Sequence, residues 1–437
     1  MRIFLFLLSM CVFFINIFAQ DAINLIDIQR GSLDSVFDSE SPEFQDESFA
    51  GDSSVINDLR RRGIEFDASY EFRGALNPGW NMRPWEFDGS EQFSWAIGVL
   101  MRASLGMTAQ VSDSFRVRTI VKIDIPSEKN GEFFSLGDFF FDYNFLDRVF
   151  LRAGKYEQSW GVSPNFSFTN LLSRIALLDI LPPELPQPDG ESYIVKFDIP
   201  IGVGGLQLLS LTRVNIAGGD TPTRETIGYG GKYNLAFRWA DFNIGVFYQD
   251  YMAARGFFSV KTSILGVDFY NEWLAVYNHH TDDSLRYAFN IGFSKNFFNN
   301  KMEINCEYFY NGEESTEFFQ PETEFRRMET SPFLEEHNFA FNFLYRFSGK
   351  LNPRFFTRAL YASTDRDIGV TTREQSLSIT PGFRVTPFPN LDIYLAVPFA
   401  LGNGYYFRSA KNVLEQHRPF SVVLYVTFHG SVRTGQK

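Results

Sequence analysis

The sequence is poor in cysteine, in histidine and in the motifs that usually carry catalysis. Only two of the 437 residues are Cys and five are His. Once the first 19 residues are removed, Cys306 is the sole thiol, which excludes an internal disulfide framework. His279 and His280 are adjacent, and neighbouring side chains of a strand point to opposite faces, so a polar hairpin loop is expected there. No CxxC pair or glycine-rich phosphate loop occurs, so we expect no enzyme, cofactor or metal site.

Long apolar runs are missing after the first 18 residues, which argues against a transmembrane helix. The first residues differ from the rest. Arg2 supplies a positive start, residues 3–17 are apolar, and Ala19 is a plausible cleavage residue. This arrangement predicts a secretory signal peptide over 1–19, so the protein is expected to be exported.

Basic residues are fewer than acidic ones, and the formal net charge is -12. An acidic exported chain gives no support for nucleic-acid binding. Residues 20–62 concentrate acids and contain few aromatics, so we expect an acidic, mostly disordered periplasmic leader. A short helix over 53–62 is the alternative.

Aromatic residues are abundant, with 50 Phe and 19 Tyr, yet the mean hydropathy is only -0.15. Residues 338–347, NFAFNFLYRF, show why: an aromatic occupies every second position and Asn, Ala, Leu and Arg lie between. Because strand side chains alternate between two faces, this pattern predicts a strand with one apolar and one polar face. About 18 strands are expected, with 16 possible. They span 64–72, 93–101, 115–123, 138–145, 148–154, 192–199, 203–213, 232–239, 242–248, 257–267, 270–278, 285–293, 302–310, 338–347, 354–361, 376–385, 391–399 and 420–428.

The connections between these strands tend to alternate between short and long. Short ones are expected at 146–147, 240–241, 298–300, 349–353 and 387–390, and long ones at 75–92, 157–190, 214–227, 312–336 and 401–418. Short turns at one end and long loops at the other are typical of outer-membrane barrels. The sequence therefore predicts an all-β fold, a transmembrane antiparallel up-and-down β-barrel over 63–431 with a tail at 432–437. A soluble β-sandwich is the alternative.

Alternation also assigns charged residues to the inward face. The candidate pore-lining residues are Arg102, Arg116, Arg118, Lys122, Arg152, Arg238, Arg286, Arg354, Arg358, Asp138, Asp142, Glu303 and Glu307. Further inward charges are Arg73, Lys196, Lys232, Lys261, Arg346, Arg384, Glu65, Asp67, Glu71, Asp198 and Asp392. Cations outnumber acids in this set, which predicts a basic wall that attracts anions. Alternatively, the arginines pair with inward acids and only stiffen the wall.

The long loop 157–190 carries helix-like apolar spacing over 168–180. An apolar helix would be unfavourable in water, so the loop is expected to fold into the barrel and narrow it; lying over the rim is the alternative.

Residues 154–161, GKYEQSWG, fit a G-K/R-x4-W-G element at a strand end. The element resembles that of large porin-like barrels in the outer membrane of diderm bacteria, including carbohydrate- and alginate-export types. The matching positions are Gly154, Lys155, Trp160, Gly161 and, in the following loop, Asn170, Leu171 and Leu172. The resemblance implies an outer-membrane channel.

Taken together, these patterns predict a porin-like channel for passive diffusion of small polar or anionic solutes, with outer-membrane lipid as its other partner. Two alternatives stay open: an adhesin or interaction barrel with a plugged lumen, and a transporter of hydrophobic compounds. The sequence leaves the oligomeric state open.

Overall fold

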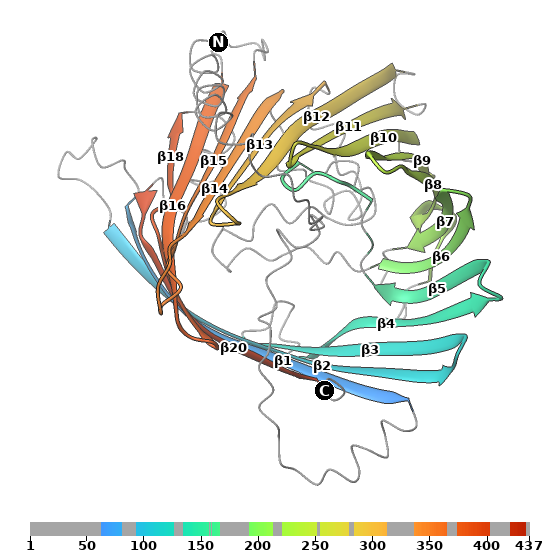
Figure 1. Ribbon diagram of the computed structural model, residues 1–437, viewed down its shortest axis with the longest axis horizontal. Coiled ribbons are helices and arrows are strands. Elements are labelled where there is room, and N and C mark those ends of the chain that lie inside the picture. Colours follow the sequence, from blue (N-terminus) through green and yellow to red (C-terminus); the bar gives the residue numbers. More distant parts are fainter. Residues whose placement is uncertain are drawn as a thin grey trace. The chain divides into compact units, whose positions relative to one another are not determined.

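The computed structural model describes residues 63–80, 93–125, 134–156, 158, 160–166, 192–212, 221–250, 254–278, 284–312, 336–364, 374–402 and 420–433. All of them belong to one compact unit, Glu47–Lys437. Its strands form a single antiparallel sheet that curves round on itself (Figure 1). No helix within the described part of the chain is long and apolar enough to cross a membrane.

The sheet contains twenty strand segments. The first ten are β1 (Ile64–Trp80), β2 (Phe93–Ser112), β3 (Phe115–Ile125), β4 (Phe134–Phe145), β5 (Val149–Tyr156), β6 (Ser192–Ile201), β7 (Gly204–Thr212), β8 (Ile227–Ala236), β9 (Ala240–Gln249) and β10 (Ala254–Ile264). The others are β11 (Val267–Asn278), β12 (Ser284–Phe297), β13 (Met302–Asn311), β14 (His337–Arg346), β15 (Arg354–Thr364), β16 (Glu374–Phe388), β17 (Leu391–Ala396), β18 (Phe399–Gly402), β19 (Phe420–Ser421) and β20 (Val423–Arg433). A 3-10 turn, Arg224–Thr226, precedes β8.

Two of the barrel strands are each interrupted once. β17 and β18 flank Val397 and Pro398, and both pair with β16; the register is the same on the two sides of the interruption and shifts only between Val385 and Phe388. Proline has no N–H to donate to the ladder, which accounts for the interruption. β19 and β20 flank Val422 and both pair with β1 in one continuous register. The twenty segments therefore form eighteen barrel strands, and the pairing of β20 with β1 closes the ring, which confirms the predicted fold.

The two ends of the barrel differ in their connections. One end carries the short turns 113–114, 146–148, 202–203, 237–239, 265–266, 298–301, 347–353 and 389–390. The connections at the other end include the long ones 157–191, 312–336 and 403–419. β1 begins and β20 ends at the short-turn end, as the predicted up-and-down arrangement requires.

One predicted turn was wrong, and a predicted site residue moves with it. β8 ends at Ala236, and the backbone amide of Phe237 donates to the carbonyl of Ala240 at 2.9 Å, which closes a turn over 237–239. Arg238 was expected on the inward face of a strand but lies exposed in this turn. Phe237 and Trp239 look like a continuation of the strand pattern, and their rings instead stack on each other 6.1 Å apart.

The two faces of the strands have different surroundings, as β14 shows. Asn338 and Ala340 on its inward face are buried, whereas Phe343 on the other face lies 6.1 Å from Phe355 of β15. Outward apolar side chains stay exposed around the ring; examples are Phe72, Phe139, Ile244, Ile291 and Phe428. A continuous exposed apolar band is unfavourable in water and favourable against lipid, where a closed ladder also leaves no backbone group unpaired. The barrel therefore has the surface of a membrane-spanning protein.

We expect Phe341→Arg to destabilise the barrel far more than Leu344→Arg on the same strand. An Arg at the lipid-facing centre of a strand costs about 2–4 kcal/mol, while Leu344 faces the lumen opposite Glu303, where a cation costs under about 1 kcal/mol. Urea unfolding of protein folded into vesicles measures both values. Equal losses for the two variants would contradict the assignment of faces.

Candidate functional site

After β5 the chain turns into the barrel instead of continuing outward. The described part of this inward segment, Gln158 and residues 160–166, is the teal trace inside the ring of strands (Figure 1). Gly154 lies near the end of β5, close to the point where the chain leaves this strand. Its φ of 144° is one that side-chain-bearing residues rarely adopt, and a Cβ there would overlap the carbonyl oxygen of Phe139. This gives a physical reason for the glycine that opens the GKYEQSWG element.

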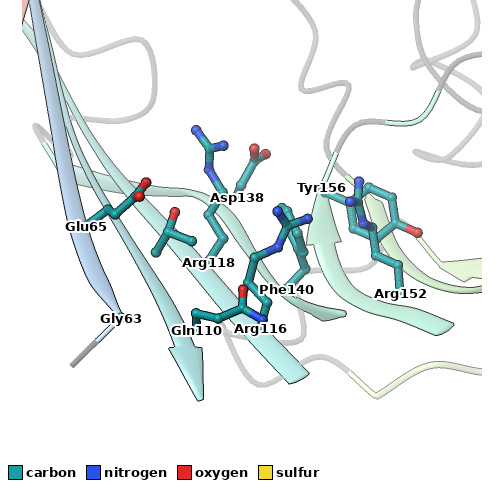
Figure 2. Close-up of a pocket in the computed structure, with 10 residues that line it drawn as sticks. Gly63, Glu65, Gln110, Arg116, Arg118, Asp138, Phe140, Arg152 and Tyr156 are labelled. Atoms are coloured by element: carbon teal, nitrogen blue, oxygen red, sulfur yellow. The ribbon is translucent and has the colours of Figure 1, made fainter. Parts of the chain in front are cut away.

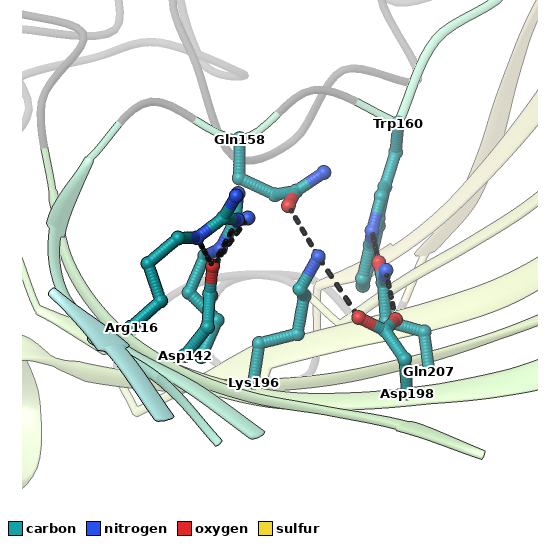
Figure 3. A network of polar contacts seen from close by, with 8 residues as sticks. Arg116, Asp142, Gln158, Trp160, Lys196, Asp198 and Gln207 are labelled. Carbon is teal, nitrogen blue, oxygen red and sulfur yellow. Dashed lines mark hydrogen bonds and ion pairs between the residues drawn. The ribbon is translucent and has the colours of Figure 1, made fainter. Parts of the chain in front are cut away.

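The start of the inward segment is hydrogen-bonded to the lumen side of β6 and β7 (Figure 3). Gln158 Oε1 accepts from Lys196 Nζ at 3.1 Å, and Lys196 Nζ also lies 3.1 Å from Asp198 Oδ2. Trp160 Nε1 donates to Gln207 Oε1, and Gln207 Nε2 donates to Asp198 Oδ1 at 2.7 Å. Lys196 and Asp198, both predicted to face inward, thus hold the segment.

Apolar residues of the inward segment cover an apolar patch on the inside of the barrel. Trp160 is 2 % exposed, and its ring lies 5.4 Å from that of Phe257. Gly230 leaves room for it, because a Cβ there would approach the Trp160 ring to 2.7 Å. Phe166 stacks on Phe309 at 5.6 Å. The buried cluster comprises Phe140, Tyr156, Trp160, Phe166, Ile194, Leu209, Leu211, Phe247, Phe257, Leu274, Val276, Ala288, Phe309 and Ala340.

The end of the inward segment is held by Glu307 of β13, which is only 1 % exposed. Its carboxylate accepts from the backbone amides of Asn165 and Phe166, each at 3.0 Å, and from the Ser163 hydroxyl. Asn290 Nδ2 of β12 donates to the same carboxylate at 3.0 Å. Hydrogen bonds to a charged acceptor are stronger than neutral ones, and several of them offset the cost of burying this carboxylate.

A second buried carboxylate, Glu272 of β11, supports the same segment. It is 0 % exposed and accepts from the backbone amides of Val162 and of Ser163, the latter at 2.9 Å. Asn342 of β14 donates to the side chain of Asn165 at 2.8 Å. Strands β11 to β14 therefore supply the hydrogen-bond partners that an irregular segment inside a barrel needs.

A cavity of about 510 Å³ lies beside β1 to β5, and several charged side chains point into it (Figure 2). Arg116 Nε donates to Asp142 Oδ2 at 3.1 Å, and Arg152 Nε donates to Asp142 Oδ1 at 2.7 Å. Arg118 lies 3.9 Å from Asp67. The lining residues are Gly63, Glu65, Thr108, Gln110, Arg116, Arg118, Asp138, Phe140, Arg152 and Tyr156.

A second group of arginines lies on β14 to β16. Arg346, Arg354 and Arg384 occupy directly paired positions on the three strands, so they form one row on the inward face. Arg384 donates to Asp392 at 2.7 Å, and His429 Nε2 lies 3.0 Å from the same carboxylate. Arg358 lies on the same face of β15 as Arg354, four residues further along the strand.

The register also corrects the predicted charge balance. Asp124 pairs with Arg102 and Asp241 pairs with Lys261, so both acids share the inward face with these cations. Glu272 faces inward with Asn290. Asp124 lies one residue beyond the predicted strand 115–123, Asp241 lies in the predicted turn 240–241, and Glu272 lies in a weakly alternating segment. The inward excess of cations is therefore smaller than predicted, and positive charge is concentrated in the two arginine groups.

The other predicted site residues lie on several strands, and their contacts differ. Arg102 Nε lies 3.2 Å from Asp124, and Arg346 lies 3.3 Å from Glu303 near the short-turn end. Lys122 pairs with Ser135 across β3 and β4. The Lys155 ammonium donates to the carbonyl of Leu136, and Lys155 pairs with Phe139, whose side chain is on the outer face, so this lysine does not line the lumen.

Some predictions lie outside the described residues. These are the signal peptide, the acidic leader, the helix over 168–180, His279, His280 and the motif positions Asn170, Leu171 and Leu172. Arg286 belongs to β12, but its side chain is likewise outside the description. Within the described ranges, no group of three or more His, Cys, Asp and Glu side chains is placed to hold a metal ion. Sequence reasoning missed Glu272 and Asn290, and their inward position on a strand was the available signal.

The closed eighteen-strand antiparallel barrel has the fold of outer-membrane porins. OpdL of Pseudomonas aeruginosa matches with a TM-score of 0.54 at 10% identity, over 84% of this chain and 99% of that one. OpdQ of the same organism gives 0.54 at 11% identity over the same shares of 84% and 99%. OccAB1 of Acinetobacter baumannii gives 0.50 at 10% identity, over 84% and 96%. No family model and no curated protein matches the sequence.

We expect Glu307→Ala to release the end of the inward segment, because it leaves buried amide and hydroxyl donors without their acceptor. Each such orphan costs about 1–3 kcal/mol. The amides of Asn165 and Phe166 should then exchange hydrogen about a hundredfold faster. Hydrogen exchange read by mass spectrometry checks this.

Glu303→Ala is the matched control, since Glu303 lies on the same strand and contacts Arg346 near the short-turn end. Its amide exchange over 160–166 should stay as in the unaltered protein. Unchanged exchange in Glu307→Ala would show that the carboxylate does not hold the segment.

Proposed function

We propose that this protein is a passive channel for small polar or anionic solutes in the outer membrane of a diderm bacterium. One observation carries the proposal: the described part of the inward segment lies against the apolar cluster and the carboxylates of β11 and β13, whereas arginines on β3 remain exposed. Glu272 and Glu307 are buried beneath the segment, whereas the Arg116 and Arg118 side chains are 44% and 40% exposed. A solute in the lumen would therefore meet guanidinium groups and water.

The arginines around the cavity are held in place and still keep donors for a solute. Asp142 is shared by Arg116 and Arg152, so this group of three carries a net positive charge. Each guanidinium has five N–H donors, and Asp142 engages only some of them. A fixed cation in a narrow aqueous path raises the local concentration of anions without binding them so tightly that passage stops.

The hydrophobic-compound alternative meets a specific obstacle. The apolar cluster inside the barrel would suit such a compound, but Trp160 and Phe166 of the inward segment fill it, and both are nearly fully buried. The plugged-barrel alternative differs from the channel in one measurable property, the conductance.

Purified protein in a planar bilayer should give steady conductance steps with a modest preference for anions. Replacing Arg116 and Arg118 by Ser should lower the anion preference, because the cavity loses two fixed cations. Reversal potentials in a salt gradient give the selectivity of both forms.

A variant with Ser at Lys301 and Lys350 removes the same charge from the short turns and is expected to keep most of the anion preference. The absence of conductance steps from folded protein would reject the channel. Steps with unaltered selectivity after loss of Arg116 and Arg118 would show that these residues only brace the wall.

A further inference from the structure

Each of the eight short turns carries, or lies within two residues of, a large, exposed apolar side chain. Leu146 is 90% exposed and Leu265 is 93% exposed. The full set is Val111, Phe145, Leu146, Ile201, Val203, Phe237, Trp239, Ile264, Leu265, Phe298, Phe347, Leu351 and Phe388. Single exposed apolar residues are ordinary, but one at every turn of the same end is a pattern.

Three of these side chains occupy backbone positions that disfavour them. Leu146, Leu265 and Phe298 have φ values of 52°, 54° and 53°, the left-handed region. Tight hairpin turns of this shape prefer Asn or Gly at such positions, and bulky residues adopt them rarely. The turns therefore keep an apolar side chain where the backbone alone would select a small or polar one, which implies an apolar environment for the tips.

The apolar tips are continuous with the lipid-facing surface of the strands. The ring of Trp239 lies 5.5 Å from that of Phe242 on β9, and Phe242 lies 6.3 Å from Phe258 on β10. At another turn, Phe347 lies 6.3 Å from Phe383 on β16. The outer aromatic surface thus extends past the strand ends onto the turns.

The turns also carry more cations than acids. Arg148, Arg238, Lys301 and Lys350 are the four basic residues of the eight turns, and all are exposed; Asp113 and Asp147 are the two acids. Aromatic and basic side chains together are the composition that proteins use at membrane interfaces, where anionic headgroups lie beside the acyl chains.

We propose that the short turns bind an anionic phospholipid leaflet: their apolar tips enter the acyl boundary and their arginines and lysines contact the headgroup phosphates. The lipid-binding surface of the barrel then includes its turns, which do not project into water. This inference rests on the membrane-spanning surface and is independent of the proposed channel function.

Leu265→Asn tests the tips, because the two possible environments predict opposite signs. Asn fits the left-handed position better, so a turn in water should become more stable or stay unchanged. If the turn lies in lipid, the variant loses the favourable free energy of transferring the Leu side chain out of water. The folding equilibrium constant in vesicles should then fall about tenfold. Asn352→Gly is the control, since Asn352 also has a positive φ of 43° and contributes no apolar side chain.

A nitroxide label at Leu146→Cys, in a Cys306→Ser background, measures the depth of a tip directly. In vesicles containing phosphatidylglycerol, we expect higher collision rates with oxygen than with a water-soluble nickel complex. A label at lumen-facing Ser104→Cys, whose side chain meets Ser69, should show the reverse. A tip label as accessible to nickel as the Ser104 label would overturn the proposal and leave this surface for an aqueous partner.

The headgroup part is tested by replacing Lys301 and Lys350 with Ser. The extra stability that phosphatidylglycerol gives over neutral vesicles should fall by about half, since two of the four turn cations are lost. An unchanged lipid dependence would overturn the contact with anionic headgroups. Conductance plays no part in these measurements, so their failure and that of the channel proposal are distinguishable.

Discussion

The requirement that every backbone N–H and C=O find a partner inside the protein governs this structure. Lipid offers no hydrogen bonds, so a sheet that spans it must close on itself, as β1 does with β20. Closure then divides the side chains of every strand between oil and lumen, because successive residues point to opposite faces. The aromatic richness of the chain and its modest hydropathy both follow from that division.

The backbone of the inward segment also needs hydrogen-bond partners inside the protein. Its irregular backbone cannot join the ladder, and it lies among apolar side chains that offer no acceptors. Glu272 and Glu307 supply them, and the cost of burying the two carboxylates is offset by the hydrogen bonds that they accept. The donors are the amides of Val162, Ser163, Asn165 and Phe166, together with the Ser163 hydroxyl and the Asn290 side chain. The described part of the segment is hydrogen-bonded to β6, β7 and β11 to β14, whereas the Arg116 and Arg118 side chains on β3 remain partly exposed.

The strands of the barrel could be predicted from the sequence because the alternation of apolar and polar side chains is a local property, visible within about ten residues. All eighteen predicted strands correspond to barrel strands, including the two that are interrupted. The anchor of the inward segment could not be predicted in this way. Ser163 and Glu307 are 144 residues apart, and alternation places Glu307 inward without saying what covers it. Arg238 was misplaced because the aromatic residues around it continue the strand pattern through a turn.

The most direct test of this account is the reactivity of single cysteines at consecutive positions of β3, from Arg116 to Thr119, in protein folded into vesicles. A charged, water-soluble thiol reagent should modify positions 116 and 118, which face the arginine side of the lumen, and spare 117 and 119, which face lipid. A lipid-soluble quencher should quench a fluorophore attached at position 117 or 119 more strongly than one attached at position 116 or 118. Uniform labelling along the strand, or protection of positions 116 and 118 from the aqueous reagent, would contradict the account.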